Sequence, residues 1–324
     1  MGALYDGALV WDTHSGFAPD PAADLENLEL WRSAGVTFLS VNVGFDLFPW
    51  DQSVRTLAAF RHWIAAHGDR FVFADGVDAV RRAKSTGKTA IAFDLEGMNA
   101  LDGRLEMLEL YRDLGVRQIL FAYNRNNAAG GGCHDDDVGL TDFGRSAIDE
   151  MNRLGITVDV SHCSLRTSLE AIAYSKKPVV FSHSNARAVW NHGRNIVDEQ
   201  IVACAKRGGV VGVNGLNHFT GPGSPVDKIV DHIEYFMNVA GPAHVGIGLD
   251  YGFPVETIAD IDSVVKEHPE YWPPEAGYGD RPVEFTPPSA LPAVADALLE
   301  RGHPENVVRG VLGENFARVA AEVW

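Results

Sequence analysis

Histidines and carboxylates stand at the ends of several short apolar runs in this chain. "VDVSHCS" (158–164) and "VVFSHSN" (179–185) both close on Ser-His, and their histidines are 21 residues apart. Together with the ends of other apolar runs, the full set is His14, Glu96, His162, His183 and Asp250. Imidazole with carboxylate is the ligand set of Zn²⁺ or a related divalent metal. One such histidine is more often a hydrogen-bonded structural group, and one such acid is often a helix N-cap. Five such side chains, each at the end of a different apolar run, favour a metal site.

Eight apolar runs alternate with helix-like segments and would carry these side chains. The runs are 8–14, 37–43, 89–96, 118–124, 157–162, 178–184, 209–215 and 244–250. Continuous apolar strands that alternate with amphipathic helices are typical of a parallel sheet covered by helices. Eight units predict an α/β fold, a (β/α)₈ TIM-type barrel whose active site lies at the carboxyl ends of the strands. An open doubly wound sheet is the alternative, but a Gly-rich turn after the first strand is missing.

The remaining segments fit one barrel. Residues 252–290 contain several prolines and predict a long excursion after the eighth strand, and 304–324 predict closing C-terminal helices. We therefore expect a single metal-dependent hydrolase domain over residues 1–324. "GGGCHDDDVG" (130–139) predicts a flexible, solvated lid or turn in preference to a second metal site.

Composition narrows the class of partner. The 324 residues carry 27 Lys+Arg against 44 Asp+Glu, a net charge of −17, which disfavours nucleic acid and anionic lipid. Three cysteines without paired spacing indicate a reducing compartment, and Cys163 is expected to be a buried small residue. Without a signal peptide or an apolar stretch of about 20 residues, the chain is expected to be cytoplasmic. The expected partner is a small-molecule substrate, and the sequence leaves open whether the chain forms a homo-oligomer.

Long motifs resemble those of the membrane dipeptidase (renal dipeptidase) family of the metal-dependent amidohydrolase superfamily. They are "GLTDFGRSAIDEMNRLGITVDVSHCS", "PVVFSHSNARAVWNHGRNIVDEQIVACAKRGGVVGVN" and "HVGIGLDYG". The resemblance runs over nearly the whole chain and implies a (β/α)₈ barrel that hydrolyses dipeptides with two zinc ions. Glu96 matches the carboxylate that bridges the metals, and His162 and His183 match the imidazoles of one site. His14 and Asp250 match ligands of the other site, and Arg194 matches the arginine that holds the substrate carboxylate.

Two positions depart from the family pattern. The family's first motif is His-x-Asp, but "DTHSGF" places Gly16 where the second ligand would stand. Asp12 shares that strand face but lies a layer deeper, and the family has an Asp there too, so it is no replacement. We therefore expect one tight Zn²⁺ site and a weak second site. Tyr123 stands where typical members have a histidine near the substrate carbonyl, and a phenol can still donate a hydrogen bond to an oxyanion.

These observations predict a zinc-dependent dipeptidase-like hydrolase that cleaves dipeptides or similar small amides. Asp250 is the expected proton carrier, Tyr123 the oxyanion donor and Arg194 the substrate anchor. Because Gly16 removes a ligand, a degenerate barrel that binds a small molecule without turnover is the alternative. A phosphate-binding barrel enzyme ranks last, since Asp250 at the mouth would repel phosphate.

Overall fold

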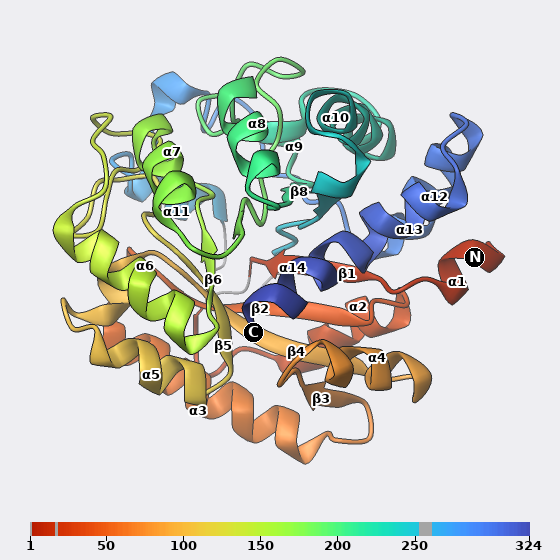
Figure 1. The fold of residues 1–324 in the computed structure, drawn as a ribbon, viewed down its shortest axis with the longest axis horizontal. Helices are drawn as coiled ribbons and strands as arrows, with labels where there is room; N and C mark the ends of the chain where they lie inside the picture. The colour runs from red at the N-terminus through yellow and green to blue at the C-terminus, as the bar shows by residue number, and fades with distance from the viewer. Residues whose placement is uncertain (1, 17–18, 253–260) are drawn as a thin grey trace.

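Parallel strands form a barrel in the computed structural model, which describes residues 2–16, 19–252 and 261–324 (Figure 1). The sheet order is β7-β6-β5-β4-β2-β1-β9-β8, and a parallel bridge between Phe181 and Val211 joins the two ends of this order. The strands are β1 Trp11–Ser15, β2 Phe38–Phe45, β3 Phe71–Phe73, β4 Thr89–Glu96, β5 Val116–Leu120, β6 Thr157–Asp159, β7 Val179–Val180, β8 Val211–Val213 and β9 Val245–Ile247. The predicted (β/α)₈ architecture is confirmed, and each of the eight predicted runs overlaps one barrel strand.

The short strand β3 was not predicted. It pairs with the first half of β4, through Phe71–Thr89, Val72–Ala90 and Phe73–Ile91, and lies off the ring of eight. The second half of β4 pairs with β5 instead, from Phe93 onwards. Its apolar stretch, residues 71–74, has four residues and is shorter than the six- to eight-residue runs that marked the other strands.

Helices surround the ring of strands (Figure 1). They are α1 Ala3–Gly7, α2 Glu29–Ser33, α3 Trp50–Ala66, α4 Val77–Ser85, α5 Glu106–Asp113, α6 Asp142–Leu154, α7 Leu165–Tyr174, α8 Asp198–Lys206, α9 Asn217–Thr220, α10 Pro225–Ala240, α11 Ile261–Glu267, α12 Leu291–Glu300, α13 Glu305–Arg309 and α14 Asn315–Val323. Short 3₁₀ turns are η1 Leu25–Leu28, η2 Met98–Leu101, η3 Pro242–His244, η4 Pro274–Ala276 and η5 Pro288–Ala290, and η6 Gly310–Glu314 is a π-helical turn. Among the described residues, no helix is long and apolar enough to span a bilayer.

Local signals explain how helices begin and end near the strand ends. The Thr141 hydroxyl accepts from Gly144 N at 3.0 Å and caps α6, and Gly155 ends that helix with φ 71°. The Ser164 hydroxyl accepts from Thr167 N at 3.2 Å and caps α7. Because this cap follows two residues after His162, the connection from β6 to α7 is a tight turn that carries the histidine.

The amino ends of the strands are closed by the chain terminus. Trp11 stacks on Phe38 with ring centroids 3.8 Å apart, and Trp324 lies 5.6 Å from Trp11. Phe316 of α14 belongs to the same apolar cluster, and Figure 1 shows α14 across the middle of the ring. The predicted C-terminal helices therefore form the floor of the barrel, opposite the strand ends that carry the predicted site.

Candidate metal centre

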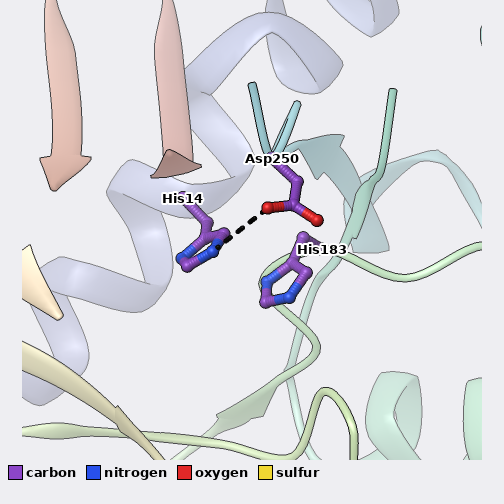
Figure 2. Close-up of side chains that lie close together, drawn as sticks. All are labelled: His14, His183 and Asp250. Atoms are coloured by element: carbon purple, nitrogen blue, oxygen red, sulfur yellow. Dashed lines mark ion pairs between the residues drawn. The ribbon is translucent and has the colours of Figure 1, made fainter. Parts of the chain in front are cut away.

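The five predicted ligands converge at the carboxyl ends of the strands. His14 lies in β1 and Glu96 ends β4, while His162, His183 and Asp250 each lie three residues beyond the last residue of β6, β7 and β9. Their nitrogen and oxygen atoms form two groups, each within 4.8 Å: His14 with His183 and Asp250, and Glu96 with His162 and His183. Figure 2 shows the first group, whose three side chains point at one another.

Glu96 lies between the two groups. Its Oε1 is 3.4 Å from His14 Nε2, whereas its Oε2 is 3.4 Å from His162 Nε2 and 3.6 Å from His183 Nε2. Asn42 Nδ2 donates to Oε1 at 3.0 Å and helps to hold the carboxylate in this orientation. A carboxylate that offers one oxygen to each group can bridge two metals.

The inner nitrogens of His162 and His183 face each other without a proton between them. His162 Nδ1 is 2.6 Å from Asn124 Oδ1, which can only accept, so the ring hydrogen lies on Nδ1. The Ser182 hydroxyl donates to Asp159 and therefore accepts from His183 Nδ1 at 2.7 Å. Both Nε2 atoms are then lone-pair acceptors, yet they are only 2.9 Å apart. Two acceptors at this distance repel unless a cation lies beside them, so the donor set fits a metal.

The ionisation of these histidines agrees with that assignment. Burial lowers the pKa of His162 and of His183 well below the usual value, and the Arg194 and His14 charges lower both further. Both rings are therefore neutral, the form in which imidazole binds a metal.

His14 lies among carboxylates. Its Nδ1 is 3.1 Å from Asp94 Oδ1, and its Nε2 is 3.5 Å from Asp250 Oδ1, the contact drawn in Figure 2. Burial acts to lower the pKa of His14, but Asp94 and Glu96 outweigh it and raise the pKa well above the usual value. Burial raises the pKa of Glu96 to about 7, although His14 acts in the opposite direction. The pocket thus holds buried negative charge that a bound cation would stabilise.

Backbone strain is concentrated at the site. Among the described residues, four that are not glycine have positive φ: Asp102 at 51°, Asn124 at 59°, His162 at 62° and Asp250 at 55°. Three of the four belong to the centre or touch it. Such conformations cost about 1–3 kcal/mol each and persist only where surrounding contacts enforce them.

Sequence reasoning missed the residues that orient the ligands. Asp94 bonds His14, Asn124 bonds His162, and Asp159 acts on His183 through Ser182. Asn214 Nδ2 donates to Asp250 Oδ2 at 2.8 Å. Their position in the chain was the available signal. Asp94, Asn124 and Asp159 lie within three residues of a predicted site residue, and Asn214 directly follows β8.

Tyr123 covers the centre. Its ring stacks on His162 with centroids 4.3 Å apart and lies 5.9 Å from the ring of Trp272. Burial raises the pKa of the Tyr123 phenol well above its usual value, and the nearby charges of Glu96 and Asp250 raise it further. The phenol therefore keeps its proton and can donate a hydrogen bond.

Arg194 is buried behind His183. Its Nη2 donates to the His183 carbonyl at 2.7 Å and its Nη1 to the Ser184 hydroxyl at 2.9 Å. Its Nε is buried and finds no acceptor among the described residues. Arg194 and His162 line a cavity of about 210 Å³, but Glu96, His183 and Asp250 are not among its lining residues.

The two positions near the first strand behave as expected from their spacing. A Cβ placed on Gly16 would lie 3.0 Å from Asp250 Oδ1, so a side chain there would enter the His14–Asp250 group. Asp12 accepts from Trp31 Nε1 at 2.8 Å and from Leu249 N at 2.9 Å. Both carboxylate oxygens of Asp12 are thus occupied, which agrees with its exclusion as a substitute ligand.

The predicted lid is largely a fixed loop. Cys133 N donates to the His162 carbonyl and His134 N to the Asn124 carbonyl, both at 2.8 Å. Only the acidic part matches the expectation, because Asp136 and Asp137 are exposed. Cys163 is buried, as predicted.

Comparisons with known proteins agree with this arrangement. The sequence model of the membrane dipeptidase family, peptidase family M19, matches residues 23–267. This range includes all the predicted ligands except His14. A protein of Schizosaccharomyces pombe described as an uncharacterized dipeptidase is 39% identical over 201 residues, covering 59% of this chain. The match spans 48% of that protein, about half of its length.

Solved structures resemble the whole chain. A crystal structure of an amidohydrolase from Pseudomonas aeruginosa is 31% identical with a TM-score of 0.89, covering 99% of this chain and 98% of the other. A metallopeptidase from Rhodobacter sphaeroides, solved with a phosphinate mimic of the dipeptide L-Ala-D-Ala, has a TM-score of 0.75 at 21% identity. It covers 98% of this chain and 99% of its own, and at this identity the likeness shows the fold.

A parallel barrel with imidazoles and carboxylates gathered at the carboxyl ends of its strands has the architecture of a barrel enzyme. The family match covers most of the chain, and the full-length structural likeness is consistent with it. The chain belongs to the membrane dipeptidase family.

Proposed function

We propose that this protein is a metal-dependent hydrolase that cleaves dipeptides or similar small amides with water. One observation carries the proposal: two neutral imidazoles present lone pairs 2.9 Å apart, with a Glu96 oxygen at 3.4 Å and 3.6 Å. A cation beside the two nitrogens relieves their repulsion. Family membership and the dipeptide mimic bound by the Rhodobacter sphaeroides relative support the substrate class.

Zinc is the metal that we propose. Glu96, His162 and His183 supply two imidazoles and one carboxylate, which with one open position match a catalytic zinc site. A metal bound there would lower the pKa of a water molecule and polarise the carbonyl of the scissile amide. The second group has His14 and Asp250 but Gly16 in place of a third charged ligand, so we propose that it binds metal weakly.

The chain's own residues handle the proton and the substrate. Asp250 takes the proton of the attacking water and gives it to the amine nitrogen as the C–N bond breaks. Tyr123 donates its phenol hydrogen to the oxygen that gains charge. Arg194 binds the free carboxylate of the dipeptide with the guanidinium hydrogens that protein atoms leave unused. The alternative of a barrel that binds without turnover is not favoured, because the residues for each step are present.

The first prediction tests the tight site through His183. Because His183 belongs to both groups, His183→Ala should remove most of the bound metal and all dipeptide hydrolysis. Metal would be measured by elemental analysis of protein purified without chelator, and activity with a panel of dipeptides. Glu150→Ala, a change at a half-buried side chain on α6 that pairs with Arg153, is the control and should leave both unchanged. A His183→Ala protein that kept its metal and its activity would disprove the assignment.

A further inference from the structure

Residues 130–134, here called the glycine loop, lie directly against two strand ends of the metal centre. Cys133 N donates to the His162 carbonyl, and His134 N donates to the Asn124 carbonyl, each at 2.8 Å. Gly132 also forms an antiparallel bridge with Cys163. The loop therefore pairs with the backbone of a metal ligand and of the residue that orients it.

Both of those residues, His162 and Asn124, have left-handed backbone conformations. His162 has φ 62° and Asn124 has φ 59°, and His162 Nδ1 donates to Asn124 Oδ1 at 2.6 Å. Left-handed backbone in a residue with a side chain relaxes unless the surroundings hold it. The carbonyls of both residues are held by the glycine loop.

Gly132 allows this close approach. A Cβ on Gly132 would lie 2.2 Å from Asn124 C, 2.4 Å from Asn124 O and 2.3 Å from Arg125 N. These are backbone atoms, so they cannot swing aside as a side chain would. Any larger residue at 132 must push the loop away from Asn124.

Two side chains fix the loop from the other side. Thr167 Oγ1 accepts from Gly131 N at 2.8 Å and donates to the Val138 carbonyl at 2.8 Å. Asn126 Oδ1 accepts from Gly132 N at 3.1 Å. The loop is thus held between α7 and the segment that follows β5, and neither of these two side-chain anchors is a proposed ligand.

We propose that the glycine loop is a positioning element of the metal centre, and that Gly132 is the residue that lets it hold His162 and Asn124 in their metal-binding geometry. The inference rests on the proposed metal site. It predicts that metal affinity depends on a residue that is not itself a metal ligand.

The test measures the dissociation constant for Zn²⁺ of metal-stripped protein by competition with a chromophoric chelator. Gly132→Ala should bind Zn²⁺ roughly 10- to 100-fold more weakly, the usual effect of disturbing groups that orient metal ligands. The control is Gly139→Ala in the adjoining segment, where the three atoms nearest to a Cβ belong to the Glu170 carboxyl group. That carboxylate accepts from Leu140 N, Arg145 and Arg166, which are not residues of the metal centre. Gly139→Ala should keep the wild-type affinity.

Urea unfolding of the metal-free variants separates positioning from general stability. We expect the two alanine variants to unfold at similar urea concentrations although their affinities differ. If Gly132→Ala does not fold, Thr167→Val decides, because it removes one anchor of the loop without adding bulk and should weaken Zn²⁺ binding several-fold. Wild-type affinity in Gly132→Ala, or in Thr167→Val when that variant decides, would overturn the proposal, as would an equal loss in Gly139→Ala. Wild-type protein that binds no metal would instead contradict the proposed function.

Discussion

At the scale of single residues, the serines of the two Ser-His pairs both position the same histidine. Ser182 accepts from His183 Nδ1 and donates to Asp159. Ser161 Oγ accepts from His183 N at 3.2 Å and lies 3.2 Å from Ser182 Oγ. His162 is oriented by Asn124 instead. Both serines therefore fix His183, the residue shared by the two ligand groups.

Arg194 gives a prediction on substrate binding. If its guanidinium pairs with the free carboxylate, Arg194→Ala should raise KM for free dipeptides roughly ten- to a hundredfold, since a hydrogen bond to a charged group contributes about 1.5–3 kcal/mol. KM for the same dipeptides with an amidated carboxyl end should change far less. The measurement is steady-state kinetics on matched pairs of free and amidated peptides.

Arg194→Lys is the control for charge without a forked donor, and it should recover only part of the loss. Metal content must be measured in both variants, because Arg194 Nη2 also bonds the His183 carbonyl. Equal increases in KM for free and amidated peptides would mean that the arginine only supports the backbone of that loop.

Gly16 gives a prediction on metal count. We expect the protein as isolated to hold nearer one metal than two, and Gly16→Asp to raise the occupancy of the His14–Asp250 group. The Cβ of the new residue would lie 3.0 Å from Asp250 Oδ1, so the two carboxylates would be close enough to repel without the metal and to bind it together. Gly16→Asn adds the same bulk without the charge and should gain much less. Two fully occupied metals in anomalous diffraction of the unmodified protein would contradict the inference.

At the scale of elements, the pattern of apolar runs was enough to predict the eight barrel strands. The predicted runs are buried on both faces in a barrel and are six to eight residues long, whereas the apolar stretch at β3, residues 71–74, has only four. The site follows from the same pattern, because parallel strands bring their carboxyl ends together. Placement of His14, Glu96, His162, His183 and Asp250 in one cluster therefore needed only strand ends.

The geometry of that cluster could not be predicted from the sequence. The strands β6, β7 and β9 end at Asp159, Val180 and Ile247, three residues before His162, His183 and Asp250. The turns that orient these ligands include left-handed backbone at His162 and Asp250. His and Asp adopt that conformation more often than most residues, but too rarely for the sequence to place it. The glycine loop was expected to be flexible because its composition resembles a loop, and its anchors lie 36 residues away on α7.

At the scale of the whole molecule, the two ends of the barrel are closed by different parts of the chain. The floor is α14 with Trp11 and Phe38, and the roof is a separate apolar cluster that includes Leu216, Trp272 and Tyr278. Trp272 and Tyr278 come from the predicted excursion after the last strand, whose residues 253–260 lie outside the described residues. The proposed metal ligands at the barrel mouth are thus separate from the apolar cluster of the floor. We therefore expect variants of the ligands to keep a folded barrel.

Stability of that barrel should fall in mild acid, and His232 on α10 isolates one cause. His232 is buried, and its Nδ1 accepts from Ala186 N at 3.2 Å while its Nε2 lies 3.3 Å from the Thr220 carbonyl. Burial lowers the pKa of His232 to about 4, although the Thr220 carbonyl acts to raise it. The unfolded chain takes up the proton near its usual pKa of about 6.5 and the folded chain does not. The stabilisation is therefore fully present above pH ~6.5 and is lost as pH falls towards ~4.

The loss from this one histidine should be about 2 kcal/mol between pH ~7 and ~5, at about 1.4 kcal/mol per pH unit below ~6.5. His134 and His192 have pKa values lowered by burial to about 4 and about 3, so they act in the same direction in wild type and variant alike. His232→Asn keeps an acceptor for Ala186 N but cannot take up the proton. The free energy of unfolding would be measured in urea on metal-free protein at both pH values. Since the other histidines cancel in the comparison, the drop should be about 2 kcal/mol smaller in His232→Asn. Equal drops in the two proteins would mean that His232 gains its proton in the folded state as readily as in the unfolded one.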